Sequence, residues 1–398
     1  MSGSPEQGSI ISGIGISHIG RRTGIPALDL TLESSRAAIA DAGLTASDID
    51  GIATLGDTPV STAAKALGID PTVKVGGFDT GGLLSPVMSA FLTVAAGHAR
   101  HVLVYRTVQM MGGSVIPDDR AADAPAPGRG DATDDDSRAG LMRAMADMEP
   151  LLAAQAFSAV NWLAMHCQRH MHLYGTTKEQ LGWLALNSRR NAGRNPLAVY
   201  RDPMSMDDYL AARPVSSPLG LLDCDVPVDG SIAVVVSAAD HADACPHRPI
   251  RVEAIGGADG RGGWMHRPDY PKMAATDAAA EMWSRTDLKP ADIDIAELYD
   301  GFTFLTFAWL EALGICGDGD AGPYVEGGAR IALDGALPLN TYGGQLSAGR
   351  MHGYWVLHEA CLQLRGDAAE HQVARQPEVA VVSNGGGPIA GCLLLTRG

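Results

Sequence analysis

The stretch that decides the fold is Asn340-Thr-Tyr-Gly-Gly-Gln-Leu-Ser-Ala-Gly-Arg-Met-His-Gly-Tyr354. Its Gly-Gly turn leads into a helical pattern from about Gly353 to Arg365, and the apolar strand Val379–Ser383 follows that helix. A glycine loop, a helix and a buried strand in this order are typical of a layered α/β fold.

The same local plan occurs earlier in the chain. A glycine turn there precedes a helix from about Gly82 to Gly97 and the apolar strand His101–Tyr105. We therefore predict an internal duplication of two halves, residues 1–245 and 246–398, with an insertion region at about 106–215 in the first half.

The composition fits a globular α/β protein and excludes several classes of partner. Hydrophobic residues make up 46% of the 398 residues and there are 48 glycines, which indicates close backbone packing. The formal net charge of −16 argues against binding to nucleic acid or to anionic membranes. The N-terminus lacks a leader pattern and no apolar run is long enough to span a bilayer, so we expect a cytoplasmic protein.

Cysteine and histidine spacing gives little support for a metal site. The six cysteines contain no CxxC pair, so neither a disulfide framework nor a cysteine zinc site is predicted. His166 and His170 share one face of a predicted helix, but no glutamate lies between them as in HExxH. We therefore predict packing or capping roles for these histidines and no metal. The segment Gly112–Ala139 is rich in Pro, Gly and Asp and is predicted to be an exposed loop.

Six strings spread over nearly the whole chain carry a family resemblance. In chain order they are Tyr174-Gly-Thr-Thr-Lys-Glu-Gln-Leu, Asn191-Ala-Gly-Arg-Asn-Pro, Leu222-Asp-Cys-Asp-Val-Pro-Val-Asp-Gly230, Glu297-Leu-Tyr-Asp-Gly-Phe-Thr303, the Asn340 loop and Ser383-Asn-Gly-Gly-Gly387. Together they resemble the thiolase superfamily, in particular the sterol-carrier-protein-type thiolases and the related lipid-transfer-protein group. The resemblance implies a thiolase-like α/β fold: two duplicated βαβαβ halves with five-stranded sheets and helices stacked in layers, a tight homodimer, and an active site where the halves meet.

The residues that carry acyl transfer in an authentic thiolase are replaced here. Alignment of Phe78-Asp-Thr-Gly-Gly82 with the usual Cys-x-Ser/Thr-Gly pattern places Phe78 at the position of the nucleophilic cysteine. Arg350 stands where the activating histidine is expected, and Ser383 stands where the second cysteine is expected. Because all three members are replaced, we expect no Claisen chemistry through a covalent acyl-enzyme.

These replacements favour a resemblance to the thiolase-like aldolases of bacterial steroid side-chain breakdown. Such enzymes cleave a β-hydroxyacyl-CoA by a retro-aldol step, which gives a ketone or an aldehyde and a short acyl-CoA. The step needs a base for the β-hydroxyl proton and hydrogen-bond donors for the thioester enolate, and it needs no nucleophile.

Tyrosines are the implied catalytic groups of those aldolases, and Tyr299, Tyr354 and Tyr342 are the candidates here. His352, two residues after the replaced histidine, is a candidate for proton transfer or for donation to the enolate. A structural alternative stays open for each residue: a half-buried tyrosine whose hydroxyl bonds to the backbone, or a histidine that caps the following helix.

A second group is predicted to bind the substrate, and its members are Asp300, Arg350, Gly344, Ser383 and Gly386. Arg350 is a permanent cation and cannot be a general base. We favour an ion pair with Asp300 or Glu359 for it over contact with a CoA phosphate, and Asp300 is a candidate to orient Tyr299 or Arg350. The Ser383–Gly387 turn offers backbone N–H groups to an enolate oxygen, although a plain tight turn also needs glycines.

Two other functions stay open at this point. One is an acyltransferase that uses Ser383 or Cys392, and the other is a catalytically silent subunit that binds acyl-CoA or lipid. The resemblance implies no tightly bound cofactor, since CoA is part of the substrate. It also implies a complex of two plus two chains with a small acyl-CoA-binding protein that combines a zinc ribbon and an OB-fold, so zinc is expected in the partner only.

Overall fold

The computed structural model describes residues 4–55, 58–76, 82–111, 149–258 and 263–398. Phe78 and the predicted loop Gly112–Ala139 lie outside the described residues. Within the described part of the chain, no helix combines the length and the apolar character needed to cross a membrane.

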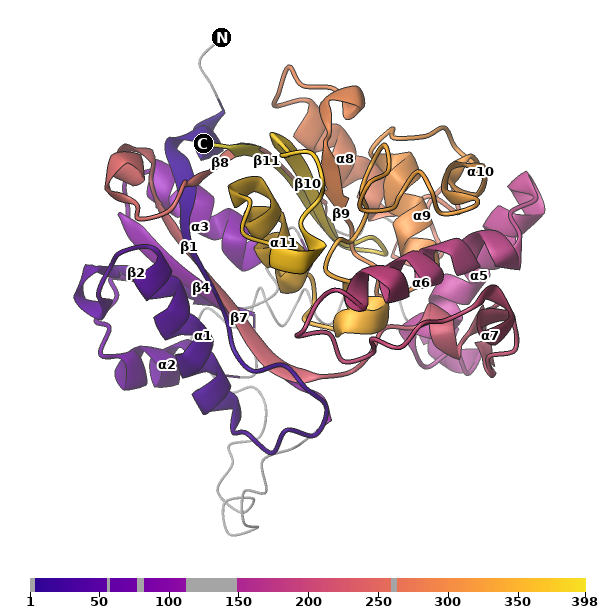
Figure 1. The fold of residues 1–398 in the computed structure, drawn as a ribbon, viewed down its shortest axis with the longest axis horizontal. Coiled ribbons are helices and arrows are strands. Elements are labelled where there is room, and N and C mark those ends of the chain that lie inside the picture. The colour runs from indigo at the N-terminus through magenta and orange to yellow at the C-terminus, as the bar shows by residue number, and fades with distance from the viewer. Residues whose placement is uncertain (1–3, 56–57, 77–81, 112–148, 259–262) are drawn as a thin grey trace.

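Nine strands of the described chain form one mixed sheet that runs through the molecule (Figure 1). Their order is β3-β2-β4-β7-β1-β8-β11-β10-β9. The strands are β1 (Ser9–Ile16), β2 (Gly51–Thr54), β3 (Val73–Gly76), β4 (His101–Gln109), β7 (Asp229–Ala238), β8 (Ile250–Ala258), β9 (Ile295–Glu297), β10 (Val379–Gly385) and β11 (Ala390–Arg397). A separate hairpin joins β5 (Pro214–Ser216) to β6 (Leu219–Gly220).

The strand order shows the predicted duplication. In the first half, β2 runs parallel to β4, β4 antiparallel to β7, and β7 antiparallel to β1. In the second half, β9 runs parallel to β10, β10 antiparallel to β11, and β11 antiparallel to β8. The halves therefore repeat one order with the same relative directions, and they join where β1 pairs antiparallel with β8. The boundary between residues 245 and 246 stays a prediction.

The second half has four strands among the described residues, not the five that the resemblance implied. At the position that corresponds to β3, Leu339 pairs with Ala296 through an isolated parallel bridge. Pro338, next to it, accepts a hydrogen bond from the Ala296 N–H but has no N–H of its own to donate. A longer ladder therefore cannot continue through this proline.

Helices cover the sheet on both faces (Figure 1). They are α1 (Ala27–Asp41), α2 (Val60–Leu67), α3 (Ser85–Ala95), α5 (Ala159–Tyr174), α6 (Lys178–Ala192), α7 (Met206–Leu210), α8 (Ala274–Trp283), α9 (Thr303–Ala312), α10 (Ala321–Val325) and α11 (Tyr354–Arg365). Side chains of α3 and α11 share one core with strands of both halves. Helices α1 and α2 pack on the other face of the first half, and α8 and α9 on the other face of the second. The predicted layered α/β fold is confirmed.

Alternation of side chains along the strands builds these layers. On β4, Val104 points into the shared core and Leu103 into the core under α1 and α2. On β10, Val382 points into the shared core and Val381 into the core under α8 and α9. These strands are buried on both faces, which is why the sequence shows them as continuous apolar runs.

The Asn340–Tyr354 loop lies between the two halves. It begins directly after Leu339, which bridges to β9, and it ends where α11 begins at Tyr354. Within it, Arg350 forms a parallel bridge with Pro227, just before β7 of the first half. Side chains of the loop can therefore meet residues from both halves.

Candidate active site

The Asn340–Tyr354 loop has an irregular backbone. Gly344–Ala348 form a π-helical turn, and Asn340 and His352 have left-handed φ values of 48° and 50°. This conformation is unfavourable for residues other than glycine, so surrounding contacts must hold it. π-helical turns and strained residues concentrate at functional sites.

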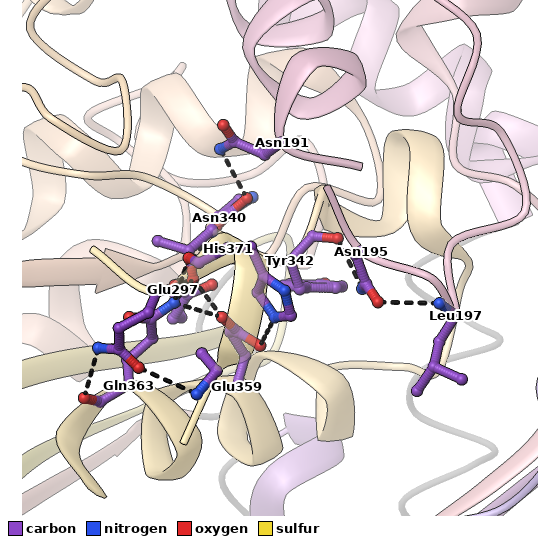
Figure 2. A network of polar contacts seen from close by, with 12 residues as sticks. Asn191, Asn195, Leu197, Glu297, Asn340, Tyr342, Glu359, Gln363 and His371 are labelled. Atoms are coloured by element: carbon purple, nitrogen blue, oxygen red, sulfur yellow. Dashed lines mark hydrogen bonds and ion pairs between the residues drawn. The ribbon is translucent and has the colours of Figure 1, made fainter. Parts of the chain in front are cut away.

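Two asparagines, one in the last turn of α6 and one three residues after that helix ends, hold the main chain of this loop (Figure 2). Asn191 Nδ2 donates to the Asn340 carbonyl oxygen at 3.1 Å, and Asn195 Nδ2 donates to the Tyr342 carbonyl oxygen at 2.9 Å. Both asparagines belong to the string Asn191-Ala-Gly-Arg-Asn-Pro that carried part of the resemblance. This string therefore positions the loop.

Asp300, three residues after the end of β9, is bound to the main chain of the π-helical turn. Its carboxylate accepts hydrogen bonds from the N–H groups of Gln345 at 2.8 Å and Leu346 at 3.5 Å. A Cβ atom on Gly344 would lie 1.9 Å from Asp300 Oδ2, and its φ of +60° also favours glycine. Burial raises the pKa of Asp300 to about 6, although these main-chain hydrogen bonds act in the opposite direction. Asp300 thus holds the π-helical turn by hydrogen bonds, and the absence of a side chain at Gly344 allows this close approach.

Ser383 binds the main chain of Tyr299. The Tyr299 ring is largely buried, and its N–H donates to Ser383 Oγ at 3.0 Å. Ser383 itself is fully buried on β10. Burial raises the pKa of Tyr299, so its hydroxyl is protonated at neutral pH. The predicted binding residue Ser383 is therefore committed to the backbone of a predicted catalytic residue.

Arg350 pairs with Asp225, so the expected ion pair with Asp300 or Glu359 was wrong. Arg350 Nη1 lies 3.3 Å from Asp225 Oδ1, and its Nε and Nη2 contact the sulfur of Met110 at 3.1 and 3.0 Å. Asp300 is occupied by the π-helical turn, and Glu359 lies in a separate buried network. Burial raises the pKa of Asp225 to about 7, with Arg350 acting in the opposite direction. Asp225 is therefore a carboxyl group that titrates near neutral pH.

His352 is a neutral hydrogen-bond donor with a defined tautomer. Its Nδ1 lies 2.5 Å from Arg106 Nη2, and a guanidinium has only donors, so Nδ1 must accept. The ring proton is then on Nε2. Burial, with the nearby cations Arg106 and Arg350, lowers the pKa of His352 well below 6.5. Asn384 Nδ2 donates to the His352 carbonyl oxygen at 2.6 Å and so supports the left-handed backbone.

Tyr342 and Tyr354 are fully buried, and their hydroxyls have no hydrogen-bond partner among the described residues. The Tyr342 ring stacks on Trp355 with the ring centroids 5.1 Å apart. Burial raises the pKa of both tyrosines, which makes both hydroxyls neutral donors. The side-chain amide of Gln345 is also unpaired within the described chain. Buried unpaired polar atoms are uncommon, so their concentration on this loop favours a site for a polar ligand.

In the glycine turn after β10, the Gly386 N–H already has a partner. Gly386 N–H donates to the Ile389 carbonyl oxygen at 3.1 Å, and Trp309 Nε1 donates to the Gly385 carbonyl oxygen at 3.0 Å. The Gly386 N–H is therefore already paired, contrary to its expected availability to an enolate. Asn384, on β10 just before the turn, contacts the site through the His352 carbonyl oxygen instead.

His166 and His170 of α5 have separate protein partners. The two ring nitrogens of His166 lie 3.0 and 2.8 Å from main-chain carbonyl oxygens. His170 Nε2 lies 2.9 Å from Glu311 Oε1, and its Nδ1 lies 2.8 Å from Thr176 Oγ1. Each ring nitrogen thus faces a protein group, and the two rings do not converge on one point.

Sequence reasoning missed two site residues, Asp225 and Arg106. Asp225 lies within a string that carried the resemblance, and Arg106 directly follows the predicted strand His101–Tyr105. The strand continues to Gln109, and Arg106 is 7% exposed. A cation inside an otherwise apolar strand was the available signal, because arginine is rarely buried without a role.

Comparison with known proteins agrees with this geometry. A family model described as Thiolase C-terminal domain-like matches residues 258–393. The chain is 33% identical over 396 residues to the 17-hydroxy-3-oxo-4-pregnene-20-carboxyl-CoA lyase of Mycobacterium tuberculosis, which covers 96% of this chain and 98% of the relative. It is 32% identical over 407 residues to the steroid side-chain-cleaving aldolase of Thermomonospora curvata, which covers 96% and 97%.

A solved structure has the same architecture over the whole length. The Ltp2-ChsH2(DUF35) aldolase superposes with a TM-score of 0.85 at 30% sequence identity and covers 98% of each chain. The resemblance expected from the six strings is thus confirmed by sequence and by structure. The chain belongs to the thiolase superfamily, in the group of the thiolase-like steroid side-chain aldolases.

Proposed function

We propose that this protein cleaves a β-hydroxyacyl-CoA thioester by a retro-aldol step and releases a ketone or an aldehyde and a short acyl-CoA. A steroid side chain or a similarly bulky acyl group is the proposed substrate, because the whole-length relatives are named for steroid side-chain cleavage and for a pregnene carboxyl-CoA. One observation carries the proposal. Ser383 Oγ is engaged by the Tyr299 N–H, while the hydroxyls of Tyr342 and Tyr354 are buried and unpaired among the described residues.

This arrangement suits stabilisation of an enolate better than nucleophilic attack. Arg350, at the position of the thiolase histidine, cannot take a proton from a hydroxyl or a thiol. Cys392 is fully buried in β11, and burial raises the pKa of its thiol, so a thiolate is disfavoured there. Acyl transfer through Ser383 or Cys392 is therefore the weaker candidate.

The residues suggest a division of roles. Asp225, with its pKa of about 7, accepts the proton of the substrate β-hydroxyl. The hydroxyl of Tyr299, which lies near Asp225, orients the substrate β-hydroxyl. The C–C bond then breaks, and its electron pair forms the thioester enolate. His352 Nε2–H and the Arg350 guanidinium stabilise the enolate oxygen. The Tyr354 hydroxyl gives a proton to the α-carbon, and the proton taken up by Asp225 then returns to the Tyr354 oxygen, which restores both groups without a cofactor.

The proposal includes a partner. We expect a small acyl-CoA-binding protein with a zinc ribbon and an OB-fold, with zinc in that partner only and no tightly bound cofactor in this chain. Support comes from the similar solved structure, which is named for Ltp2 together with ChsH2(DUF35). A homodimer and a cytoplasmic location are also parts of the proposal. Co-expression with such a partner, followed by mass measurement of the purified complex, tests the assembly.

Incubation of the complex with a β-hydroxyacyl-CoA tests the activity. Cleavage should give a ketone or an aldehyde together with a short acyl-CoA, each detected by chromatography. Saturable thioester binding without cleavage would instead make the protein a binding subunit. Acyl transfer from acetyl-CoA would make it an acyltransferase.

Tyr299→Phe and Tyr354→Phe test the tyrosines. Tyr354→Phe should lower kcat by about 10²- to 10⁴-fold, the usual contribution of a general acid. Tyr299→Phe should also lower kcat, because it removes the hydroxyl that orients the reacting groups. Tyr105→Phe is the matched control, since Tyr105 is also fully buried but its hydroxyl donates to the Thr58 carbonyl oxygen at 2.7 Å. An equal loss of kcat in the control would show that the tyrosines act only through packing.

A further inference from the structure

A buried polar network lies directly under the Asn340–Tyr354 loop (Figure 2). It joins Glu297 at the end of β9, Thr341 of the loop, Glu359 and Gln363 of α11, and His371. The first four are fully buried and His371 is 6% exposed. The roles assigned above to the tyrosines, Asp225 and His352 do not use this network.

Thr341 stands at its centre between two carboxyl groups. Thr341 Oγ1 lies 2.6 Å from Glu297 Oε1 and 2.5 Å from Glu359 Oε1. Gln363 Nε2 donates to Thr341 Oγ1 at 3.1 Å, and the Thr341 N–H donates to Glu297 Oε1 at 3.1 Å. Both carboxyl groups therefore contact the same hydroxyl.

A count of protons shows that one of the two acids must be neutral. The threonine hydroxyl has a single proton and can donate to only one carboxylate. If both acids were ionised, the other carboxylate would face the hydroxyl oxygen with no proton between them, in a buried environment. One carboxyl group must therefore donate its own proton to Thr341.

The remaining contacts identify Glu297 as that acid. Glu359 accepts from Gln363 Nε2 at 2.8 Å and lies 3.2 Å from His371 Nε2, so its negative charge is compensated. Glu297 Oε2 is buried and has no partner among the described residues. An unpaired oxygen is far less costly on a neutral acid than on a carboxylate.

Electrostatics agree with this assignment. Burial and the negative charge of Glu359 raise the pKa of Glu297 well above 4.5, and Asp300 adds to that effect. For Glu359, burial acts to raise the pKa, but His371, Thr341 and Gln363 outweigh it and lower the pKa below 4.5. Tyr342 also lies close to both acids, and His358 lies close to Glu359.

We propose that Glu297 is a neutral carboxylic acid that donates its proton to Thr341, shares the resulting network with the Glu359 carboxylate, and so positions the loop that carries Tyr342 for the reaction. The link to catalysis rests on the proposed function. Glu297 is a positioning residue, since it contacts the loop only through Thr341 among the contacts described. The next two residues, Leu298 and Tyr299, donate their N–H groups to Asn340 Oδ1 of the loop and to Ser383 Oγ.

Infrared spectroscopy tests the protonation state without substrate. At about pH 8, above the pKa values of Asp225 and Asp300, the folded protein should retain a C=O stretching band of a protonated carboxylic acid. Glu297→Gln should remove this band, and the matched variant Glu359→Gln should leave a band of this kind. No band in the wild-type protein, or a band lost in Glu359→Gln alone, would overturn the assignment.

The pH dependence of unfolding gives a second readout. A raised pKa in the folded state means that the stability from Glu297 is fully present below its unfolded pKa near 4.5 and is lost as the pH rises towards the folded pKa. The glutamine of Glu297→Gln cannot titrate. Its amide nitrogen cannot accept the Thr341 N–H, but the loss of that hydrogen bond lowers stability equally at every pH. The folding constant of the variant relative to wild type should therefore rise by up to about tenfold per pH unit through this window. A ratio that is independent of pH would contradict a buried neutral acid.

Kinetics of the complex test the positioning role. Glu297→Leu should lower kcat with little change in KM, and Glu297→Gln should recover part of the loss. The control is Glu6→Leu, because Glu6 is also fully buried but its contacts are the Ile255 N–H and Arg285. An equal loss of kcat in Glu6→Leu and Glu297→Leu would show that Glu297 contributes only to the stability of the fold. If no cleavage is found at all, the infrared and unfolding results still decide the protonation state.

Discussion

Replacement of Ser383 by alanine separates a positioning role from a nucleophilic role at the position of the second thiolase cysteine. The Ser383 hydroxyl accepts one hydrogen bond, from the Tyr299 N–H at 3.0 Å, and the side chain is fully buried. Alanine has no acceptor, so the variant leaves a buried N–H unpaired. Such a group costs about 1–3 kcal/mol.

That penalty sets an upper limit on the loss of activity. If all of it appears in the transition state, kcat falls by about 5- to 150-fold, since each 1.4 kcal/mol corresponds to about a factor of ten. Loss of a true serine nucleophile reaches on the order of 10⁶-fold. The two roles therefore differ by several orders of magnitude in the same variant.

The assay is kcat and KM for cleavage of a β-hydroxyacyl-CoA, with urea unfolding measured in parallel. Ser12→Ala is the matched control, because Ser12 is a buried strand serine whose hydroxyl contacts Ser237 Oγ at 2.7 Å. It should lose similar stability but keep kcat. A loss above about 10⁴-fold in Ser383→Ala, or an acyl adduct on Ser383 in the wild-type protein, would refute the positioning role.

Three further changes probe the residues around this centre. Asp225, with its pKa of about 7, is the proposed base, so kcat/KM should rise with pH through about 7. Asp225→Asn should remove this rise and lower kcat by about 10²- to 10⁴-fold. Gly344→Ala places a Cβ atom 1.9 Å from Asp300 Oδ2 at a φ of +60°, so we expect a loss of more than about 2 kcal/mol in the free energy of unfolding, measured in urea. Arg106→Met removes the donor to His352 Nδ1, which should raise the pKa of His352 in an NMR titration and lower kcat about 10-fold or more.

Local strings of the sequence predicted the layered fold, the duplication and the loop that carries Tyr342, His352 and Tyr354. The partner of Arg350 could not be predicted in this way. Asp300 was one of the two expected partners, but the N–H groups of the π-helical turn occupy it, and Asp225 comes from the first half of the chain. Such pairings depend on which acceptors the main chain has already used, and a single sequence does not contain that information.

The hydrogen-bond partner of Ser383 could not be predicted from the sequence either. Alignment placed Ser383 at a catalytic position, and the glycine-rich turn beside it suggested an enolate site. In the structure its hydroxyl pairs with the N–H of Tyr299, 84 residues away in the chain, and the Gly386 N–H of the turn pairs with the Ile389 carbonyl oxygen. A hydrogen bond of this separation appears only once β9 and β10 are side by side.

The exchange of histidine for Arg350 changes the electrostatics of the whole site. A thiolase pair needs a thiolate and a histidine that takes up its proton, which a permanent cation at that position opposes. Here Arg350 and Arg106 act in concert with burial to keep His352 neutral, so that it can donate from Nε2. Two cations beside neutral donors form an environment that favours a developing anion on the substrate. An enolate is such an anion, and the same field would hinder protonation of any histidine that had to serve as a base. The replacements at the thiolase positions therefore fit a site rebuilt for C–C cleavage better than one that has merely lost its function.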